Sequence, residues 1–254
     1  MWILKVGGRQ LDEPGFISGL AEVLKLFPQP PIIVHGGGRG TTSLVQRLGL
    51  EAHFVEGLRV TDESVLEAAI MGLAGLAKMQ LVAGLVAAGV PALGLSGVDG
   101  GLVRCRPLLK PAGLGMVGEP ARVDAERLLQ LTAQGWVVCL CPLSLDAEGK
   151  VRNLNADPVA AAVAVAVRAE TLVFLTDVEG VLVDGMSVPQ LDRALFHDLL
   201  ERGQLGEGML PKLRACFAAL DQGVEQVLVS NLDGVRDWLA GKQAGTVIRH
   251  ERLD

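Results

Sequence analysis

Short runs of apolar, largely β-branched residues alternate along the chain with longer segments in which apolar residues recur at helical spacing. Residues 2–6 and 32–36 are expected to be strands, each followed by a helix, at 16–27 and at 41–50. The same alternation of helix and strand recurs at 81–89 and 91–97, 126–135 and 136–141, and 160–169 and 171–177. This order predicts an α/β fold, a three-layer sandwich with a mainly parallel central sheet covered on both faces by crossover helices.

No internal repeat, charged block or Ser/Pro-rich linker interrupts this order. The 254 residues are therefore expected to form a single domain with two lobes. We place the boundary between the lobes near residues 168–171. The reason is chemical, because the glycine-rich segments near the start of the chain and the motif that follows Phe174 must face each other across a cleft if they serve one site.

Composition narrows the functional classes. The formal net charge of -6 leaves no general basic field for nucleic acid or an anionic membrane surface, and the absence of tyrosine leaves no platform for stacking bases. We expect no membrane span, because no apolar run is long enough, and a cytoplasmic location, because the first residues lack the features of a secretory signal. The four cysteines are expected to be buried reduced thiols, and no histidine neighbours Cys139 and Cys141 to build a metal site.

Two glycine-rich segments follow the first two predicted strands. Lys5 precedes the glycine pair 7–8, where a lysine beside accessible amides suits a phosphate, although two glycines after a strand also form ordinary tight turns. The glycines 36–38 lead into a helix with Thr41 and Thr42 as expected N-caps, and an anion is favoured there. The dinucleotide fingerprint and the P-loop are both absent, which disfavours a nicotinamide oxidoreductase and excludes a P-loop nucleotide site.

Two further segments place polar groups among apolar residues. Arg59 lies in the stretch FVEGLRVTD and needs an anionic partner, which is either a substrate carboxylate or an internal acid such as Asp62. The segment from residue 146 predicts a β-hairpin that leads into a very apolar helix, with Asn153, Asn155 and Asp157 crowded at the junction. These groups either line a pocket or include the N-cap of the helix, for which Asp157 is the candidate.

The remaining motifs lie in the second half of the chain. Thr176 and Asp177 follow a buried strand, at the carboxyl end where open α/β sheets bind ligands. Gly206 and Gly208 precede a helix whose first turn includes Lys212. A lysine is unfavourable at the positive end of a helix dipole, so it indicates a strong anion nearby, the alternative being an exposed lysine without a role.

Together these segments resemble the amino-acid kinase family. The resemblance covers nearly the whole chain and rests on eight motifs in the family's order: LKVGG, IVHGGG, GLRVTD, GLSGVDG, NLNAD, LTDVEGVL, GMLPK and GTVI. GLRVTD combined with NLNAD is similar to the branch that phosphorylates N-acetyl-L-glutamate in arginine biosynthesis, more than to the carbamate, aspartate, uridylate or glutamate branches. The resemblance implies an ATP-dependent kinase with an amino-acid kinase-like fold, in which residues 1–168 bind the acceptor and 169–254 bind the nucleotide.

The resemblance also implies roles, position by position. Lys5 and Lys212 would stabilise the transferring phosphoryl group, and Asp157 would orient both lysines. The residues implied to bind the acylamino acid are Gly37, Gly38, Arg59 and Asn153, the last two on its α-carboxylate. The residues implied to contact the nucleotide and its phosphates are Gly8, Thr176, Asp177, Gly180, Gln204, Leu205 and Gly206. The chain departs from the family pattern close to the expected nucleotide, at Arg9, Gln10 and Glu207.

The expected chemistry needs few protein groups. A carboxylate acceptor is already ionised at neutral pH, so no general base is required and the lack of a convincing catalytic histidine is expected. Mg²⁺ is expected to be held mainly by the ATP phosphates, without dedicated protein ligands. Arginine-inhibited members of the family carry an extra N-terminal helix and a histidine motif that this sequence does not show, so the resemblance implies an arginine-insensitive homodimer.

Two alternatives remain open. A kinase of the lysine-type branch would act on aminoadipate or glutamate carried by a small acidic protein, and Arg104, Arg106 and Lys110 would supply its basic docking rim. A non-catalytic sensor on the same fold would bind a nucleotide or an amino acid. The joint presence of the two lysines and the aspartate argues against such a sensor.

Overall fold

A central sheet of eight strands organises the computed structural model, which describes residues 1–206 and 209–250. The order in the sheet is β14-β16-β15-β11-β1-β2-β8-β5. In the described chain, each neighbouring pair is parallel except β15 and β16. The strands are β1 (Trp2–Val6), β2 (Ile32–His35), β5 (Ala92–Ser96), β8 (Val137–Cys141), β11 (Thr171–Leu175), β14 (Gln190–Leu191), β15 (Gln226–Ser230) and β16 (Thr246–Ile248). The predicted α/β fold with a mainly parallel sheet is confirmed.

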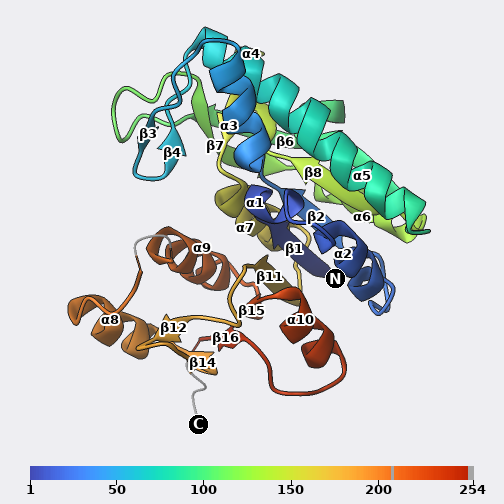
Figure 1. Cartoon of the computed structure of the whole chain (residues 1–254), viewed down its shortest axis with the longest axis vertical. Helices are drawn as coiled ribbons and strands as arrows, with labels where there is room; N and C mark the ends of the chain where they lie inside the picture. The colour runs from blue at the N-terminus through green and yellow to red at the C-terminus, as the bar shows by residue number, and fades with distance from the viewer. Residues whose placement is uncertain (207–208, 251–254) are drawn as a thin grey trace.

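Helices cover both faces of this sheet (Figure 1). Successive residues of the central strands enter opposite cores: Ile3 belongs to one apolar cluster and Leu4 to the other. One face is covered by α2 (Phe16–Leu24), α5 (Lys78–Ala87) and α10 (Leu232–Leu239), and the other by α6 (Ala125–Ala133), α7 (Ala156–Ala166), α8 (Arg193–Glu201) and α9 (Leu210–Asp221). Because both faces are buried, these strands are continuous apolar runs in the sequence.

The direction of strand addition reverses at β1. Strands β2, β8 and β5 lie on one side of β1, and β11, β15, β16 and β14 lie on the other. The first part of the chain and its last part accordingly occupy opposite ends of the molecule (Figure 1). Because β1, β2 and β11 are parallel, their carboxyl ends meet at one edge of the sheet, and that is where open α/β sheets bind ligands.

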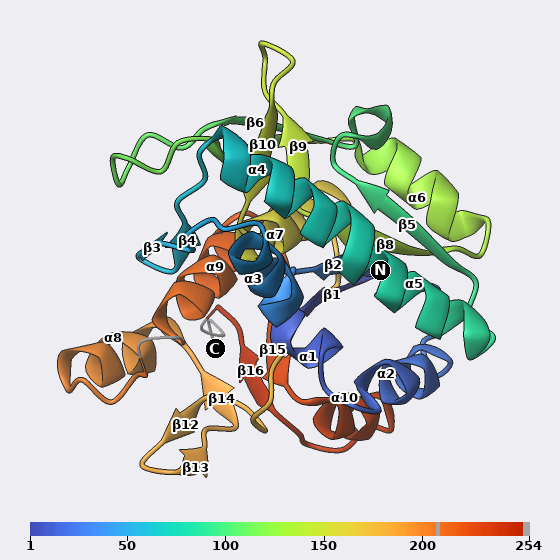
Figure 2. The same ribbon diagram turned by 45° about the horizontal axis from the view of Figure 1, so that its top comes forward.

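Smaller strands lie beside the central sheet. A closed four-stranded barrel is formed by β6 (Val103–Pro107), β7 (Val117–Val123), β9 (Leu143–Leu145) and β10 (Val151–Leu154), beside the helix α4 (Glu63–Ile70) (Figure 2). The predicted hairpin is the antiparallel pair of β9 and β10. Two-stranded ribbons are formed by β3 (Phe54–Val55) with β4 (Leu58–Arg59) and by β12 (Leu182–Val183) with β13 (Met186–Ser187), and a 3-10 turn spans Asp99–Gly101.

One long helix contradicts the expectation that no apolar run is long enough to span a membrane. Helix α4, a π-helical segment (Met71–Ala77) and α5 form a continuous helix, Glu63–Ala87, of 25 residues with an 18-residue window of mean hydropathy 1.7. Its length and hydropathy alone would allow it to cross a membrane, so the statement that no apolar segment is long enough is wrong. In the fold, α5 packs on β5 and β8 and places Leu81 and Leu85 in the core.

Candidate active site

Two lysines and an aspartate from distant parts of the chain meet at the carboxyl edge of the sheet. Lys5 Nζ lies 2.7 Å from Asp157 Oδ1, and Lys212 Nζ lies 3.6 Å from Asp157 Oδ2. The three side chains come from the end of β1 and from the first turns of α7 and α9, and each is only 12–14% exposed. Lys212 is therefore not the exposed lysine of the alternative interpretation.

The start of α7 explains why the aspartate is available to both lysines. Asn155 is the N-cap of this helix, and its side-chain oxygen accepts a hydrogen bond of 3.0 Å from the Asp157 amide. The alternative in which Asp157 itself caps the helix is thereby excluded. Its carboxylate lies in the first turn, where the helix dipole favours a negative charge, and both oxygens are left for the lysines.

The charges of this triad depend on one another. Burial opposes ionisation of the carboxyl, but the positive charges and hydrogen bonds of Lys5 and Lys212 outweigh it and hold the pKa of Asp157 below its ordinary value. Burial lowers the pKa of Lys212, an effect that Asp157 partly offsets and the charge of Lys5 increases. The aspartate thus keeps two ammonium groups close together at neutral pH.

The two glycine-rich segments contact each other backbone to backbone beside the triad. Helix α1 (Gly8–Leu11) begins at Gly8 and helix α3 (Gly38–Arg47) begins at Gly38. A Cβ atom built on Gly8 would lie under 3.0 Å from backbone atoms of both Gly37 and Gly38, and Gly38 has a φ of 58°, which favours glycine. Because the first amides of a helix lack intrahelical partners, both helix starts offer donors to an anion.

The prediction that Thr41 and Thr42 cap α3 is wrong. Gly37 holds the N-cap position, and Thr41 and Thr42 lie inside the helix. The Thr41 hydroxyl donates to the Gly37 carbonyl oxygen at 3.1 Å, a local bond that threonine also makes within helices. The glycines begin the helix because a side chain would not fit between the two loops.

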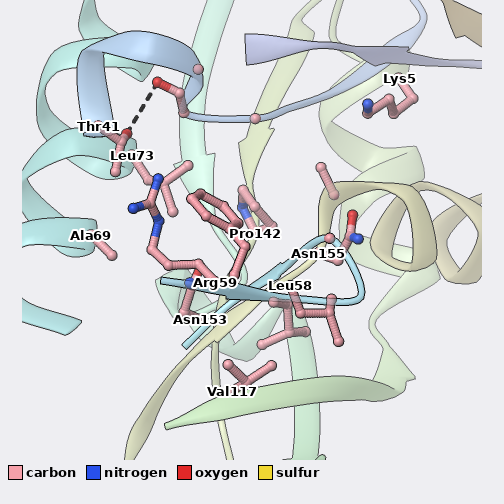
Figure 3. A pocket seen from close by; sticks show the side chains of 17 residues that line it. Lys5, Thr41, Leu58, Arg59, Ala69, Leu73, Val117, Pro142, Asn153 and Asn155 are labelled. Atoms are coloured by element: carbon pink, nitrogen blue, oxygen red, sulfur yellow. Dashed lines mark hydrogen bonds between the residues drawn. The ribbon is translucent and has the colours of Figure 1, made fainter. Parts of the chain in front are cut away.

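A small cavity of about 210 Å³ opens between α3, the β3–β4 ribbon and the barrel (Figure 3). It is lined by Gly37, Gly38, Arg59 and Asn153, four residues implied to bind an acylamino acid, and by apolar side chains such as Leu58. Thr61 connects two of them, because its hydroxyl donates to the Arg59 carbonyl oxygen at 2.7 Å and accepts from the Asn153 amide at 3.2 Å. Arg59 and Lys5 lie on different sides of this cavity (Figure 3).

Arg59 does not pair with the internal acid that was its alternative partner. Asp62 caps α4 by accepting a hydrogen bond from the Val65 amide at 2.8 Å. The Arg59 guanidinium instead donates from Nη2 to the Thr42 hydroxyl at 2.7 Å, while Nη1 is buried without a partner in the described chain. Burial lowers the pKa of Arg59. A buried guanidinium nitrogen without an acceptor favours an incoming anion.

A larger cleft of about 1260 Å³ adjoins the small cavity. Both are lined by Lys5, Gly38 and Arg59, and the cleft continues along Lys212 and the ends of β1 and β11. Gly8, Thr176 and Asp177, expected near the nucleotide, line it, as do Arg9 and Gln10. Lys5 therefore lies where the small cavity meets the large cleft, and Lys212 lies in the cleft beside it, so both can neutralise negative charge on a group that passes from the cleft to the cavity.

The other expected nucleotide residues do not line this cleft; they are Gly180, Gln204, Leu205 and Gly206. Gly180 is a packing position, because a Cβ there would lie 2.6 Å from the hydroxyl oxygens of Ser187 and Thr246. Gln204 donates to Asp184 Oδ2 at 3.0 Å. Glu207 and Gly208 lie outside the described residues.

Other titratable groups offer little to this site. All four cysteines are free and buried, as expected, and burial raises the pKa of Cys139 to about 12. His35 is buried at the end of β2, and burial lowers its pKa to about 4, so it is neutral at pH 7. Among residues 1–206 and 209–250, no group of three or more His, Cys, Asp or Glu side chains could hold a metal ion.

Comparisons of the sequence and of the structure with known proteins agree with one another. The model of the amino acid kinase family matches residues 1–231. The chain is 46% identical over 254 residues to the acetylglutamate kinase of Chloroflexus aurantiacus, covering 99% of this chain and 97% of that one. It is similar to the structure of smu.665 from Streptococcus mutans UA159, with a TM-score of 0.82 and 26% identity over 98% of both chains. It is also similar to N-acetylglutamate synthase from Neisseria gonorrhoeae complexed with coenzyme A and N-acetyl-glutamate, with a TM-score of 0.85 and 27% identity over 99% of this chain and 60% of that one.

Proposed function

Because the chain belongs to the amino acid kinase family, we propose that it transfers the γ-phosphoryl group of ATP to the side-chain carboxylate of N-acetyl-L-glutamate, in arginine biosynthesis. The observation that carries this proposal is the triad of Lys5, Asp157 and Lys212, in which Lys5 lines both the small cavity and the large cleft and Lys212 lines the cleft. The similarity to an acetylglutamate kinase over almost the full length of both chains supports the choice of acceptor.

The small cavity suits the acceptor. Arg59 and Asn153 lie at one side of it and would bind the α-carboxylate, the arginine through its buried unpartnered Nη1. The amides of Gly37 and Gly38 would contact the acyl amino acid near the phosphoryl group. Because Lys5 lies on a different side of the cavity from Arg59, the side-chain carboxylate would point toward the triad (Figure 3).

The large cleft suits the nucleotide. The ATP phosphates would lie against the Gly8 amide and the two lysines, with Thr176 and Asp177 beside them. Gly180, Gln204, Leu205 and Gly206 do not line the cleft and would contact only parts of the nucleotide that extend beyond it. Mg²⁺ would be carried by the ATP phosphates and would supply additional positive charge.

This division corresponds to two lobes, residues 1–168 for the acceptor and 169–254 for the nucleotide. It is supported by the sheet order, because strands from residue 171 onward lie on the other side of β1 from β2, β8 and β5. The positive charges of the two lysines also suit phosphoryl transfer. Phosphoryl transfer requires alignment of two anions and neutralisation of the equatorial oxygens, which fixed lysines and backbone amides provide without a general base.

Replacing Arg59 with alanine should chiefly raise the KM for the acceptor, by roughly tenfold to a hundredfold, because a charge-assisted contact to the α-carboxylate is lost. The KM for ATP should change little. Steady-state kinetics with each substrate varied in turn measures both values, and Arg59→Lys tests the need for the planar fork. An unchanged acceptor KM combined with weaker ATP binding would show that the cleft is divided differently.

The proposed reaction is tested with purified protein in a coupled assay of ADP release. The acceptors are N-acetyl-L-glutamate, unacetylated glutamate, and glutamate or aminoadipate attached to a small acidic carrier protein. Turnover with free N-acetyl-L-glutamate is expected. Preference for the carrier-linked acceptor would favour the lysine-type alternative, for which Arg104 and Arg106 are exposed on β6. Binding without turnover of any acceptor would favour a sensor.

We further propose that the enzyme is a cytoplasmic homodimer. The free cysteines fit a reducing compartment. An apolar surface on the outer side of the long helix and α3 supports a second copy as partner, and its exposed side chains include Met71, Leu76 and Met79. Met79→Glu should convert a dimer into a monomer in sedimentation analysis, whereas Lys25→Glu, at the C-terminal end of α2 and outside this apolar surface, should not. A monomeric wild type at micromolar concentration would contradict the proposal.

A further inference from the structure

The hydrogen bond between Arg59 and Thr42 joins the acceptor arginine to the helix that starts at the second glycine-rich loop. Arg59 ends β4, and Thr42 lies one turn inside α3. The distance between Arg59 Nη2 and Thr42 Oγ1 is 2.7 Å. The guanidinium also lies over the Phe54 ring, with Cζ 4.7 Å from the ring centroid. One terminal nitrogen and one face of the guanidinium are thus fixed by protein contacts.

The other terminal nitrogen is left free. Arg59 Nη1 is buried and has no hydrogen-bond partner in the described part of the chain, and Asp62, the nearby acid in sequence, is occupied in capping α4. A guanidinium presents its donors in a rigid plane, so fixing Nη2 also fixes the direction in which Nη1 can bind. The threonine contact therefore prepares the arginine for an anion that approaches Nη1.

Thr42 also touches the loop that carries the acceptor amides. Its hydroxyl is 3.5 Å from the carbonyl oxygen of Gly38, a longer contact than the 2.7 Å to Arg59. A hydroxyl can accept from the guanidinium and donate its own hydrogen to a carbonyl. Through these two contacts, Thr42 links the Arg59 guanidinium to the backbone of Gly38.

We propose that Thr42 is a positioning residue that sets acceptor specificity, by holding Nη2 of Arg59 so that Nη1 is directed at the acceptor's α-carboxylate. This inference rests on the proposed function, because it assumes an acylamino acid in the small cavity. Thr42 lines the large cleft, but its side-chain hydrogen bonds in the described chain go to Arg59 and Gly38 and not to the triad, so its effect is expected on recognition of the acceptor through Arg59.

The test compares Thr42→Val, which keeps the shape but loses the hydroxyl, with Thr42→Ser, which keeps the hydroxyl. Ser18→Ala, which removes an exposed hydroxyl on α2 that lines neither the small cavity nor the large cleft, is the control. Thr42→Val is expected to raise the KM for N-acetyl-L-glutamate by about tenfold, the order expected for a hydrogen bond to a charged group. The kcat, the KM for ATP and the thermal midpoint should stay close to wild type, and Thr42→Ser should restore the acceptor KM.

A second acceptor separates positioning from a merely structural role. The α-carboxamide of N-acetyl-L-glutamate keeps the reacting side-chain carboxylate and loses only the group that Arg59 would bind. Thr42→Val should lower the preference for the α-carboxylate over the α-carboxamide, as measured by the ratio of the two kcat/KM values. In the Arg59→Ala background, Thr42→Val should add no further loss.

The inference is overturned if Thr42→Val leaves the acceptor KM unchanged, if it lowers kcat/KM for both acceptors equally, or if its loss simply adds to that of Arg59→Ala. Each of these results would leave the proposed function intact, because the wild type would still phosphorylate N-acetyl-L-glutamate. A wild-type protein that does not phosphorylate this acceptor would overturn the proposed function and this inference together.

Discussion

Alanine at Lys5 or at Lys212 should lower kcat by at least about a hundredfold, in line with the loss of one charge-stabilising donor in a preorganised site. Both ammonium groups are held on one carboxylate, at 2.7 Å and 3.6 Å, so each is positioned before ATP binds. The KM for the acceptor should change much less, because Arg59 and Asn153 are proposed to bind its other end. Single-turnover and steady-state kinetics measure the two effects separately.

The fold should survive either replacement. Asp157 keeps one ammonium partner when the other lysine is removed, and thermal unfolding of both variants checks this. Lys242→Ala is the control, since Lys242 is 67% exposed and pairs with Asp237 on the surface, where an ion pair contributes little. Near-normal turnover of both Lys5→Ala and Lys212→Ala would reject the assigned roles.

The lowered pKa of Lys212 also predicts how the activity depends on pH. Burial lowers its pKa from the ordinary value of 10.5, so the ammonium loses its proton at a lower pH than an exposed lysine. The kcat/KM for ATP, which reports ionisations of the free protein, should therefore fall on the alkaline side below pH 10.5. Lys212→Arg should move this fall to higher pH, because a guanidinium keeps its proton.

The layered fold follows from local patterns in the sequence. The strand 2–6 and its neighbours are buried on both faces, and they are recognisable as short apolar runs between helical segments. The barrel could not be predicted in the same way. Two of its pairs, β7 with β10 and β6 with β9, join segments that are far apart in the sequence, and β6 and β7 are separated by residues 108–116. Only the tight hairpin of β9 and β10 leaves a clear signal in the sequence.

The residue types in the sequence indicated the chemistry of the site, but they did not indicate the contacts that hold its side chains in place. Lys5, Asp157 and Lys212 were recognisable because charged side chains sit beside glycines or at the start of apolar helices. Which of Asn155 and Asp157 caps α7 depends on backbone conformation, since both are good caps. The bond from Arg59 to Thr42 joins α3 to a ribbon 17 residues away, and no spacing rule predicts it. Thr61 lay within the motif GLRVTD, which could have drawn attention to it.

Gly8→Ala should abolish most activity while leaving both lysines in place. The new Cβ would meet backbone atoms of Gly37 and Gly38, which cannot rotate away as a side chain can. To admit the methyl group, the two glycine-rich loops must separate. The amides that would bind the phosphate and the acceptor then move relative to the triad, and a displacement of about 1 Å costs about a hundredfold in rate.

The neighbouring glycine provides a matched control for this substitution. Gly7 has an ordinary φ of -67°, and a Cβ there would approach only the Gln10 side chain, at 3.1 Å from Oε1. Gly7→Ala should therefore retain far more activity than Gly8→Ala, because a flexible side chain can give way where backbone cannot. We expect kcat/KM of Gly8→Ala to fall by at least about a hundredfold for both substrates. Equal activity of the two variants would show that the contact between the loops does not fix the catalytic geometry, so that the triad alone aligns the phosphate with its acceptor.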